Sequence, residues 1–444
     1  MEGVNSPVII CCLIAIVVSL AITFIRGTNV GYIAFPLAFL IGGIGMGTSA
    51  TTVISYFPIS LFVQIVLMTV FFGYAIENGT LQLIANRVVY WFRGATALLP
   101  IVLFLISFVI CAVGCAPQAI GAALAAIAFG VHKKTGLNYY VCVAAACWGG
   151  MTGGFCPTNG LFYTVIRNLL MNIGQLDAVS AASICHTLFW SQLAIQLISL
   201  GIVYFWFKAY KGADRSQIED ASGFEKPEPM NKTQKTTTII VLACVAVAII
   251  VPILKTIGIP LFVSMNNYIT MASVSTIGAA LCSILHLADD RKVVKERVPW
   301  SMLLMIAGMT ALISVMTSAG LTEWIAGIFD NAGIPTILLP LLVCLLAGIV
   351  SIFSDATSVV IPLFIPICIA ISSVTDCSLM LLITCAIIGT FTTGKSPMST
   401  GGAMLVMFAP EDRYQHWFNF TLGYSLGLLL LFSVLSLILG LFPW

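Results

Sequence analysis

Long apolar stretches separated by short polar segments run through almost the whole of this 444-residue chain. A helix needs roughly 20 apolar residues to cross the hydrocarbon core of a bilayer. Ten stretches come close to this length, two of them interrupted: 7–25, 31–47, 58–75, 137–170, 178–207, 237–257, 268–287, 301–319, 379–407 and 418–441. The pattern therefore predicts an all-α polytopic membrane protein.

Two further apolar stretches, 97–131 and 334–374, are each divided by small and polar residues. The dividing residues are 114–118 in the first and 354–357 in the second. Each half is short for a full crossing, so each stretch predicts a re-entrant hairpin with a polar tip. Such a backbone is tolerated at membrane depth only where protein or a water-filled cavity covers it.

The elements recur in the same order in two halves of the chain. Each half predicts three spans, an interfacial helix at 81–93 or 321–330, a hairpin, an interrupted span and a final span. A hydrophilic segment, 208–236, mixes charges of both signs with Gly and Pro and predicts a linker. The halves are therefore predicted to be two repeats, 1–207 and 237–444.

The spacing of polar breaks supports this repeat. Cys115 and Gly153 are 38 residues apart, and so are Ser354 and Thr392. The interrupted spans, 137–170 and 379–407, each place Pro among Gly and hydroxyl residues, which we expect to unwind the helices at the midplane. Five spans per half make the second repeat inverted, and inverted repeats with broken helices are typical of secondary transporters.

Composition agrees with a membrane protein and excludes several other classes. The chain is 60% hydrophobic and only 8% charged, whereas soluble proteins carry about 25% charged residues. A net charge of +2 gives no reason to expect nucleic acid as a partner. The 14 cysteines form no CxxC pair with partner histidines, so the sequence does not support a cysteine-ligated metal centre. We also expect no organic cofactor.

The distribution of Lys and Arg predicts the orientation. With the linker 208–236 in the cytoplasm, most other basic residues also fall inside, and Arg167 and Lys255 fall outside. Both termini are then outside, in a multi-pass protein of the plasma membrane, which in a bacterium is the inner membrane. The first hairpin enters from the cytoplasm and the second from outside.

Asp355 and Lys395 are the charged residues deepest in apolar sequence. A lone charge at the bilayer centre costs at least about 2.5–3.5 kcal/mol on insertion scales, so each needs a partner or a task. One hypothesis is that Lys395 binds a substrate carboxylate and that Asp355 holds a cation or a proton. The alternatives are a structural pair between the two, or a Lys395 side chain that snorkels to water. A fixed ammonium could also replace one coupling cation.

At this point the tips and broken spans resemble those of the ion transporter superfamily, in particular the divalent-anion/sodium symporters and the malonate and C4-dicarboxylate carriers. In that family each tip carries a Ser-Asn-Thr type motif that binds a substrate carboxylate, and each tip with its facing loop encloses a sodium ion. Residues 354–357 are similar to this motif, whereas the first tip has lost the hydroxyl groups. Family members are commonly homodimers.

The residues and the resemblance together give the candidate site. The substrate ligands are expected to be Gln118, Thr158, Asn159, Ser354, Thr357, Lys395, Ser396 and Thr400. The cation ligands are expected to be Cys115, Gly153, Asp355, Thr392 and Thr393, with sodium held at the tips and loops by Gly114, Thr152, Ser354 and Gly394.

The leading hypothesis is a carrier that couples sodium to uptake of a small organic anion, a C3 or C4 dicarboxylate in view of the resemblance. A proton-coupled or antiporting carrier, in which Asp355 titrates, is the alternative. A channel would need a repeated pore motif. An intramembrane enzyme would need a constellation such as HExxH or GxSxG, and the sequence has neither. We therefore expect a transporter and not an enzyme.

Overall fold

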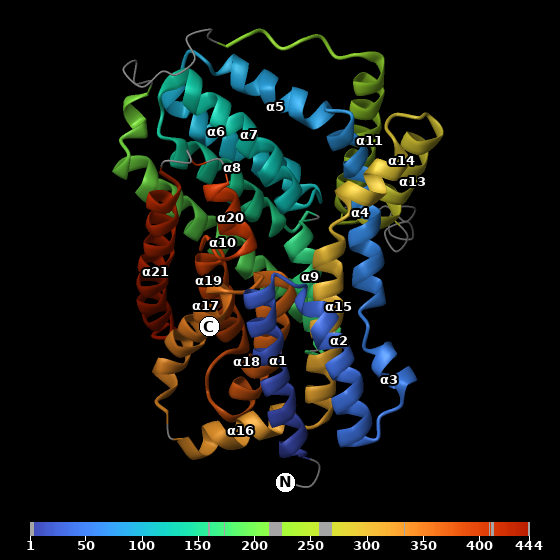
Figure 1. Cartoon of the computed structure of the whole chain (residues 1–444), viewed down its shortest axis with the longest axis vertical. Helices are drawn as coiled ribbons and strands as arrows, with labels where there is room; N and C mark the ends of the chain where they lie inside the picture. The colour runs from blue at the N-terminus through green and yellow to red at the C-terminus, as the bar shows by residue number, and fades with distance from the viewer. Residues whose placement is uncertain are drawn as a thin grey trace. The chain divides into compact units, whose positions relative to one another are not determined.

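A computed structural model describes residues 4–158, 160–172, 174–212, 224–256, 269–332, 334–407, 409 and 413–442. All regular elements in these ranges are helices (Figure 1). They form two compact units. The middle unit comprises residues 63–163 and 196–299, and the C-terminal unit comprises residues 1–62, 164–195 and 300–444. Each unit is described by itself.

The middle unit contains the first hairpin and most of the first interrupted span. Its helices are α4 (Ile59–Glu77), α5 (Thr80–Trp91), η2 (Thr96–Leu98), α6 (Leu99–Ala112), α7 (Pro117–Thr135), α8 (Tyr139–Gly154), α9 (Leu161–Asn172), α10 (Ala178–Trp206), η3 (Ala209–Lys211), α11 (Lys232–Thr256), α13 (Met271–Ile284), α14 (Asp290–Lys292) and η5 (Val293–Arg297), of which α4, α9 and α10 continue into the other unit. Helices α6, α7 and α8 pack on one another, and α5 contacts α6 and α7 (Figure 1).

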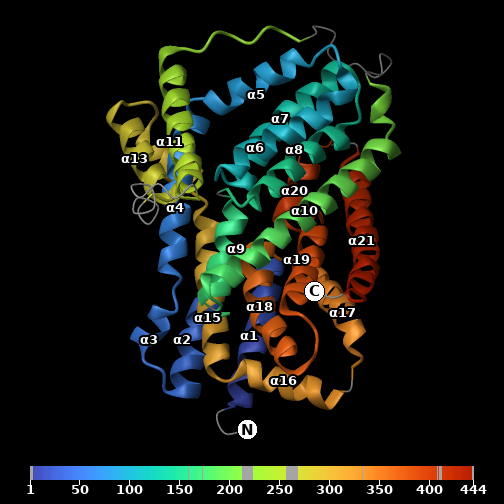
Figure 2. The same cartoon turned by 180° about the vertical axis from the view of Figure 1, so that it is seen from behind.

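The C-terminal unit contains the second hairpin and the second interrupted span. Its helices are α1 (Ser6–Arg26), α2 (Val30–Leu40), η1 (Ile41–Gly45), α3 (Ala50–Ser55), α15 (Trp300–Ser318), α16 (Leu321–Ala332), η6 (Thr336–Leu338), α17 (Leu339–Ile352), η7 (Ala356–Val360), α18 (Ile361–Val374), α19 (Leu379–Thr393), α20 (Thr400–Val406) and α21 (Tyr414–Leu439). Helices α17, α19 and α21 lie side by side (Figure 2), and α2 packs along α15.

The series of helices from α4 to α10 recurs from α15 to α21. Helices α6 and α17 both have 14 residues, both carry Pro at the second position and both follow a short 3₁₀ turn. Helices α5 and α16 both have 12 residues, close to the interfacial segments expected at 81–93 and 321–330. The repeat is therefore present in the order and length of the elements, while its inversion across a membrane stays a prediction.

Six helical segments in the described part of the chain are long and apolar enough to cross a membrane, fewer than the ten expected spans. Each interrupted span consists of two short helices, and α2 and α13 are also shorter than a full crossing. Residues 356–374 do reach a crossing length. Their interpretation as one arm of a re-entrant hairpin therefore stays a prediction. The segment expected to end at 257 and the one starting at 268 border residues outside the described ranges.

The first halves of the two interrupted spans are the centres of their units. Almost every residue of α8 and nearly all of α19 from Leu381 onward are buried. A helix that is apolar on all sides is typical of such a central position. Each backbone break therefore begins at the end of a buried central helix.

A polar network fastens α4 to the segment before α15 within the middle unit. Arg297 forms an ion pair with Glu77 at 2.7 Å. Asp290 accepts hydrogen bonds from Ser283 at 2.6 Å and from Tyr74 at 2.8 Å. These two hydrogen bonds, that from Ser283 first, hold the pKa of Asp290 below its ordinary value. The network lies outside the candidate site and has a structural role.

Candidate functional site

The break in the second interrupted span, residues 394–399, is a closed turn between α19 and α20 and is called break two. Gly394 caps α19 through its N–H, which donates to the Thr390 carbonyl at 2.8 Å. The Ser399 hydroxyl donates to the carbonyls of Gly394, at 2.6 Å, and Ser396, at 2.8 Å. It also accepts the Gly402 N–H in the first turn of α20. One side chain therefore closes the turn and starts the next helix.

Lys395 lies in this turn and has no exposed surface. The side chain therefore does not snorkel to water, which removes one of the three interpretations of its charge. Burying an ammonium group is costly unless other groups compensate for its lost hydration. A fully buried lysine at a backbone break is the feature of this unit that most needs a functional explanation.

Tip two, residues 353–355, is stabilised by Asp355. Its Oδ1 accepts the N–H groups of Thr357, at 3.1 Å, and Ser358, at 2.8 Å, together with the Ser358 hydroxyl at 2.5 Å. A carboxylate in this position satisfies free N–H groups and interacts favourably with the positive end of the helix dipole. Asp355 is thus the N-cap residue of η7.

Two hydroxyl groups join α17, the first arm of hairpin two, to the end of α19 beside break two. The Ser351 hydroxyl donates to the Thr390 carbonyl at 2.8 Å, and the Thr393 hydroxyl donates to the Gly348 carbonyl at 2.7 Å. The Ser354 hydroxyl at the tip donates to the Val350 carbonyl in its own helix. Thr392, by contrast, has a buried hydroxyl with no hydrogen-bond partner among the described residues.

The first repeat brings its tip and its break together in the middle unit. Break one comprises residues 155–160 between α8 and α9, and tip one comprises residues 113–116 between α6 and α7. The Thr158 hydroxyl donates to the Ala112 carbonyl, at the end of α6, over 2.6 Å. Asn159, an expected substrate ligand in this break, lies outside the described residues.

Tip one has few polar side chains. Gly114 has φ +109, in the region that favours glycine. Cys115 is buried, and the Ala116 side chain makes no capping hydrogen bond to α7. Gln118, in the first turn of α7, has a buried Oε1 without a hydrogen-bond partner among the described residues. It is the one side-chain amide at this tip, and its free acceptor could take a ligand hydroxyl, N–H group or cation.

Four expected loop residues prove to be helical, which corrects the predicted start of both breaks. Thr152 and Gly153 lie in the last turn of α8, and Thr392 and Thr393 in the last turn of α19. The prediction treated the glycines before each Pro as helix breakers, but they serve close packing instead. A Cβ on Gly149 or Gly153 would collide with backbone carbonyls of α6.

Thr392 and Thr393 lie beside break two, in the last turn of α19. Ser396 lies within the break, where its hydroxyl accepts the Met398 N–H. Thr400 is the first residue of α20. Thr357 is buried in the first turn of η7. Each repeat thus brings its own tip and break together, and the candidate residues form two clusters, one in each unit.

Sequence reasoning missed two hydroxyl groups. Ser399 closes break two, and its position just before α20 is a signal of an N-cap that could have been recognised. Ser107 on α6 is fully buried, and its hydroxyl has no hydrogen-bond partner among the described residues. It faces Gly150, where a Cβ would lie 2.8 Å from its Oγ. The sequence of α6 carries no signal that sets this serine apart.

Hydroxyl and carbonyl oxygens, rather than acidic clusters, are the groups that could hold a cation here. No group of three His, Cys, Asp or Glu side chains suitable for a metal ion occurs in the part of the chain that the structure describes. Sodium needs no such cluster, because backbone carbonyls at unwound helices can coordinate it. The oxygen atoms near the two breaks are therefore the candidates.

The fold is similar to that of a known transporter. The crystal structure of the Alcanivorax borkumensis YdaH transporter matches with a TM-score of 0.57 and 17% sequence identity, over 87% of each chain. None of the curated proteins compared with this chain matches its sequence. This match shows the fold, and six helical segments in the described part of the chain are long and apolar enough to cross a membrane.

A family match covers the N-terminal third of the chain. Residues 6–154 match the family described as the dicarboxylate carrier protein MatC N-terminus. The matched region ends with α8 and includes hairpin one. The chain thus resembles the dicarboxylate and anion transporter families, as its polar tips and broken spans predicted.

Proposed function

We propose that this protein is a secondary transporter that takes up a small organic anion, a C3 or C4 dicarboxylate, together with sodium ions. The observation that carries the anionic substrate is the complete burial of Lys395 in break two. A substrate carboxylate that binds at this break would form a charge-assisted hydrogen bond with the ammonium group. The match of residues 6–154 to a dicarboxylate carrier family supports the same substrate class.

Each unit, taken by itself, carries further polar groups that suit a carboxylate. The N-terminus of α20 begins five residues after Lys395, and the N-termini of η7 and α7 follow the two tips. Helix N-termini present unpaired N–H groups and a positive dipole, which attract anions. Gln118 and Ser396 add neutral polar groups, consistent with their expected role as substrate ligands.

Sodium as the coupling ion rests on the oxygen-rich breaks and on the resemblance. Thr392 presents a buried hydroxyl beside break two, and Ser107 presents one beside tip one. The alternative is proton coupling or antiport in which Asp355 titrates. Sodium dependence of uptake separates the two alternatives.

The orientation and assembly complete the proposal. The bias of Lys and Arg supports a linker, 208–236, in the cytoplasm and both termini outside. The resemblance supports a homodimer in the plasma membrane. Labelling of single cysteines placed at the linker and at the termini would test the orientation.

Uptake by the reconstituted protein tests this function. Labelled malonate, succinate and citrate are offered to proteoliposomes with and without an inward sodium gradient. We expect uptake of malonate or succinate that depends on sodium. Uptake that follows a proton gradient and ignores sodium would favour the alternative, and failure with every organic anion would overturn the substrate class.

A further inference from the structure

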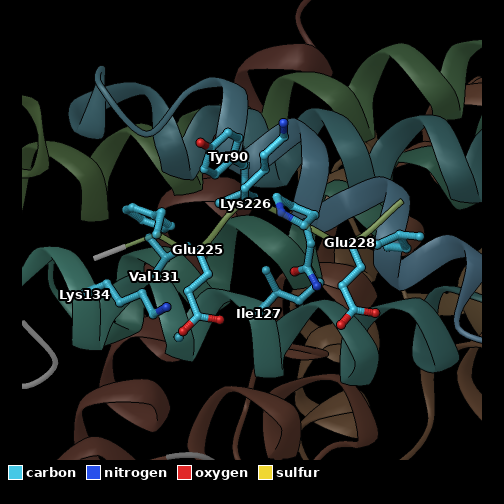
Figure 3. Close-up of a pocket in the computed structure, with 13 residues that line it drawn as sticks. Tyr90, Ile127, Val131, Lys134, Glu225, Lys226 and Glu228 are labelled. Carbon is cyan, nitrogen blue, oxygen red and sulfur yellow. The ribbon is translucent and has the colours of Figure 1, made fainter. Parts of the chain in front are cut away.

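Residues 224–228 of the linker lie on the surface of the middle unit between α5 and α7. They cover a cavity of about 420 Å³ whose walls come from these two helices and from the linker itself (Figure 3). Tyr90 and Asn86 line it from α5, and Val131 and Lys134 line it from α7. The linker is therefore in contact with the second arm of hairpin one.

Two contacts hold this segment in place, one to each helix. The Arg87 guanidinium on α5 donates from Nη2 to the Glu228 carbonyl at 3.0 Å. The Lys134 ammonium on α7 lies over the Phe224 ring, 5.8 Å from its centroid. The segment thus bridges two helices that contact each other at only a few positions.

Both flanks of the segment are also anchored in the middle unit. Downstream, Asn231 and Gln234 cap one another's backbone N–H groups, and the Gln234 side chain donates to the Asn78 carbonyl at the end of α4. Upstream, η3 contacts η2, the turn that leads into α6. The linker is thus tied to the end of α4 and to η2, which both precede hairpin one in the chain.

The described residues of the second repeat contain no equivalent of this arrangement. There, α16 packs directly along α18, the counterpart of α7. In the first repeat, linker residues line a cavity together with the interfacial helix α5 and the hairpin arm α7. A separable segment can leave and return, whereas direct helix packing cannot be released without moving a whole helix.

We propose that residues 224–228 are a cytoplasmic strap that fastens the end of α7 to α5 and restrains hairpin one. This proposal rests on the proposed function, because the restraint matters where the hairpin moves during transport. Release of the strap frees α7 from α5 and allows hairpin one to change conformation. The strap therefore sets the maximum rate of the transport cycle.

Hydrogen exchange of the full-length protein in detergent, without any substrate, tests the restraint. Phe224→Ala removes the ring over Lys134, and Arg87→Ala removes the donor to Glu228. Each should speed exchange in 127–135 by about two- to fivefold, in line with the strength of a partly exposed cation–π contact. Lys232→Ala, at an exposed residue in the first turn of α11, is the matched control and should leave exchange unchanged.

Uptake by the same variants in proteoliposomes tests the consequence. Phe224→Ala should raise the maximum rate about twofold or more without changing the substrate concentration for half-maximal uptake, while Lys232→Ala should match the wild type. Unchanged exchange in both strap variants would overturn the restraint. Faster exchange with an unchanged rate would overturn its role in the cycle. If the wild type transports none of the anions, the proposed function fails, whereas the exchange result stands independently.

Discussion

The two tips and breaks share a backbone plan but differ in chemistry. Tip two is capped by the Asp355 carboxylate, and break two holds the buried Lys395. Tip one is capped by no side chain, and break one is joined to its hairpin by the neutral hydroxyl of Thr158. In both repeats, glycines let the first half of the broken span pack tightly on the first hairpin arm.

This difference separates what the fold requires from what the substrate requires. The close packing of α6 on α8 and of α17 on α19 recurs in both repeats, so it belongs to the scaffold. Among the described tip and break residues, charged side chains occur in the second repeat only, and the proposed function assigns Lys395 to the substrate. We infer that the second repeat discriminates the charge of the substrate and that the first repeat supplies neutral contacts.

The largest expected effect follows from removing the buried ammonium. Lys395→Met preserves most of the side-chain volume and should lower uptake by about 30-fold or more, because losing one partner of a buried charged contact costs 2–5 kcal/mol. Initial rates in proteoliposomes measure this effect.

Thermal unfolding of the same variant is the control. A midpoint close to that of the wild type would show that the loss of uptake does not come from unfolding, because removing one partner of a structural buried ion pair costs about 3–5 kcal/mol. Wild-type uptake by a normally expressed Lys395→Met protein would remove the charge difference between the two repeats.

The next effect tests the shared scaffold. Gly149→Ala and Gly389→Ala would push a Cβ into the carbonyls of Phe104 and Cys344, respectively. Overpacking of this kind costs about 1–3 kcal/mol or more, so both variants should unfold at a clearly lower temperature. Fluorescence-detected thermal unfolding in detergent gives the measurement.

Gly130 and Gly423 provide matched controls, because a Cβ at either position meets no atom within 4 Å. Gly130→Ala and Gly423→Ala should leave the unfolding temperature unchanged or slightly raised, since Ala has the higher helix propensity. If Gly149→Ala is tolerated and Gly389→Ala is not, the packing is not shared between the repeats.

A smaller effect concerns the cap that only tip two possesses. Asp355→Ala removes the acceptor for two N–H groups and should cost about 0.5–2 kcal/mol of stability. Asp355→Asn keeps an acceptor and should recover most of the loss. Equal losses in the two variants would instead point to the charge of Asp355, and thus to coupling, as its main role.

The smallest effect comes from giving tip one a cap. Ala116→Ser places a hydroxyl at the N-cap of α7 and should stabilise the protein by up to about 1 kcal/mol. The unfolding midpoint and the rate of uptake are measured together. A lower midpoint would show that the apolar tip is packed too closely to accept even one hydroxyl group.

Much of the helical layout could be predicted from the sequence, because apolar length and turn residues determine it locally. Both interfacial helices and both interrupted spans lie close to their expected positions. The predicted start of each break was wrong, because glycine can either unwind a helix or allow close packing. Only the position of the neighbouring helix shows which of these applies at Gly149 or Gly389.

The candidate site was less predictable than the helices. The residues around Asp355 resemble an N-cap sequence, so its capping role could have been recognised from the chain. The complete burial of Lys395 and the unpaired hydroxyl of Ser107 depend on tertiary packing, which no local pattern contains.

The buried lysine also bears on how the protein is made. Helix α19 has only 15 residues and is followed at once by a charge that inserts into a bilayer at a cost of about 2.5–3.5 kcal/mol. This segment packs between α17, made before it, and α21, made after it. We therefore expect stable insertion of break two to wait until α21 has left the ribosome. Chains that end before α21 should be recognised by cellular quality control and degraded.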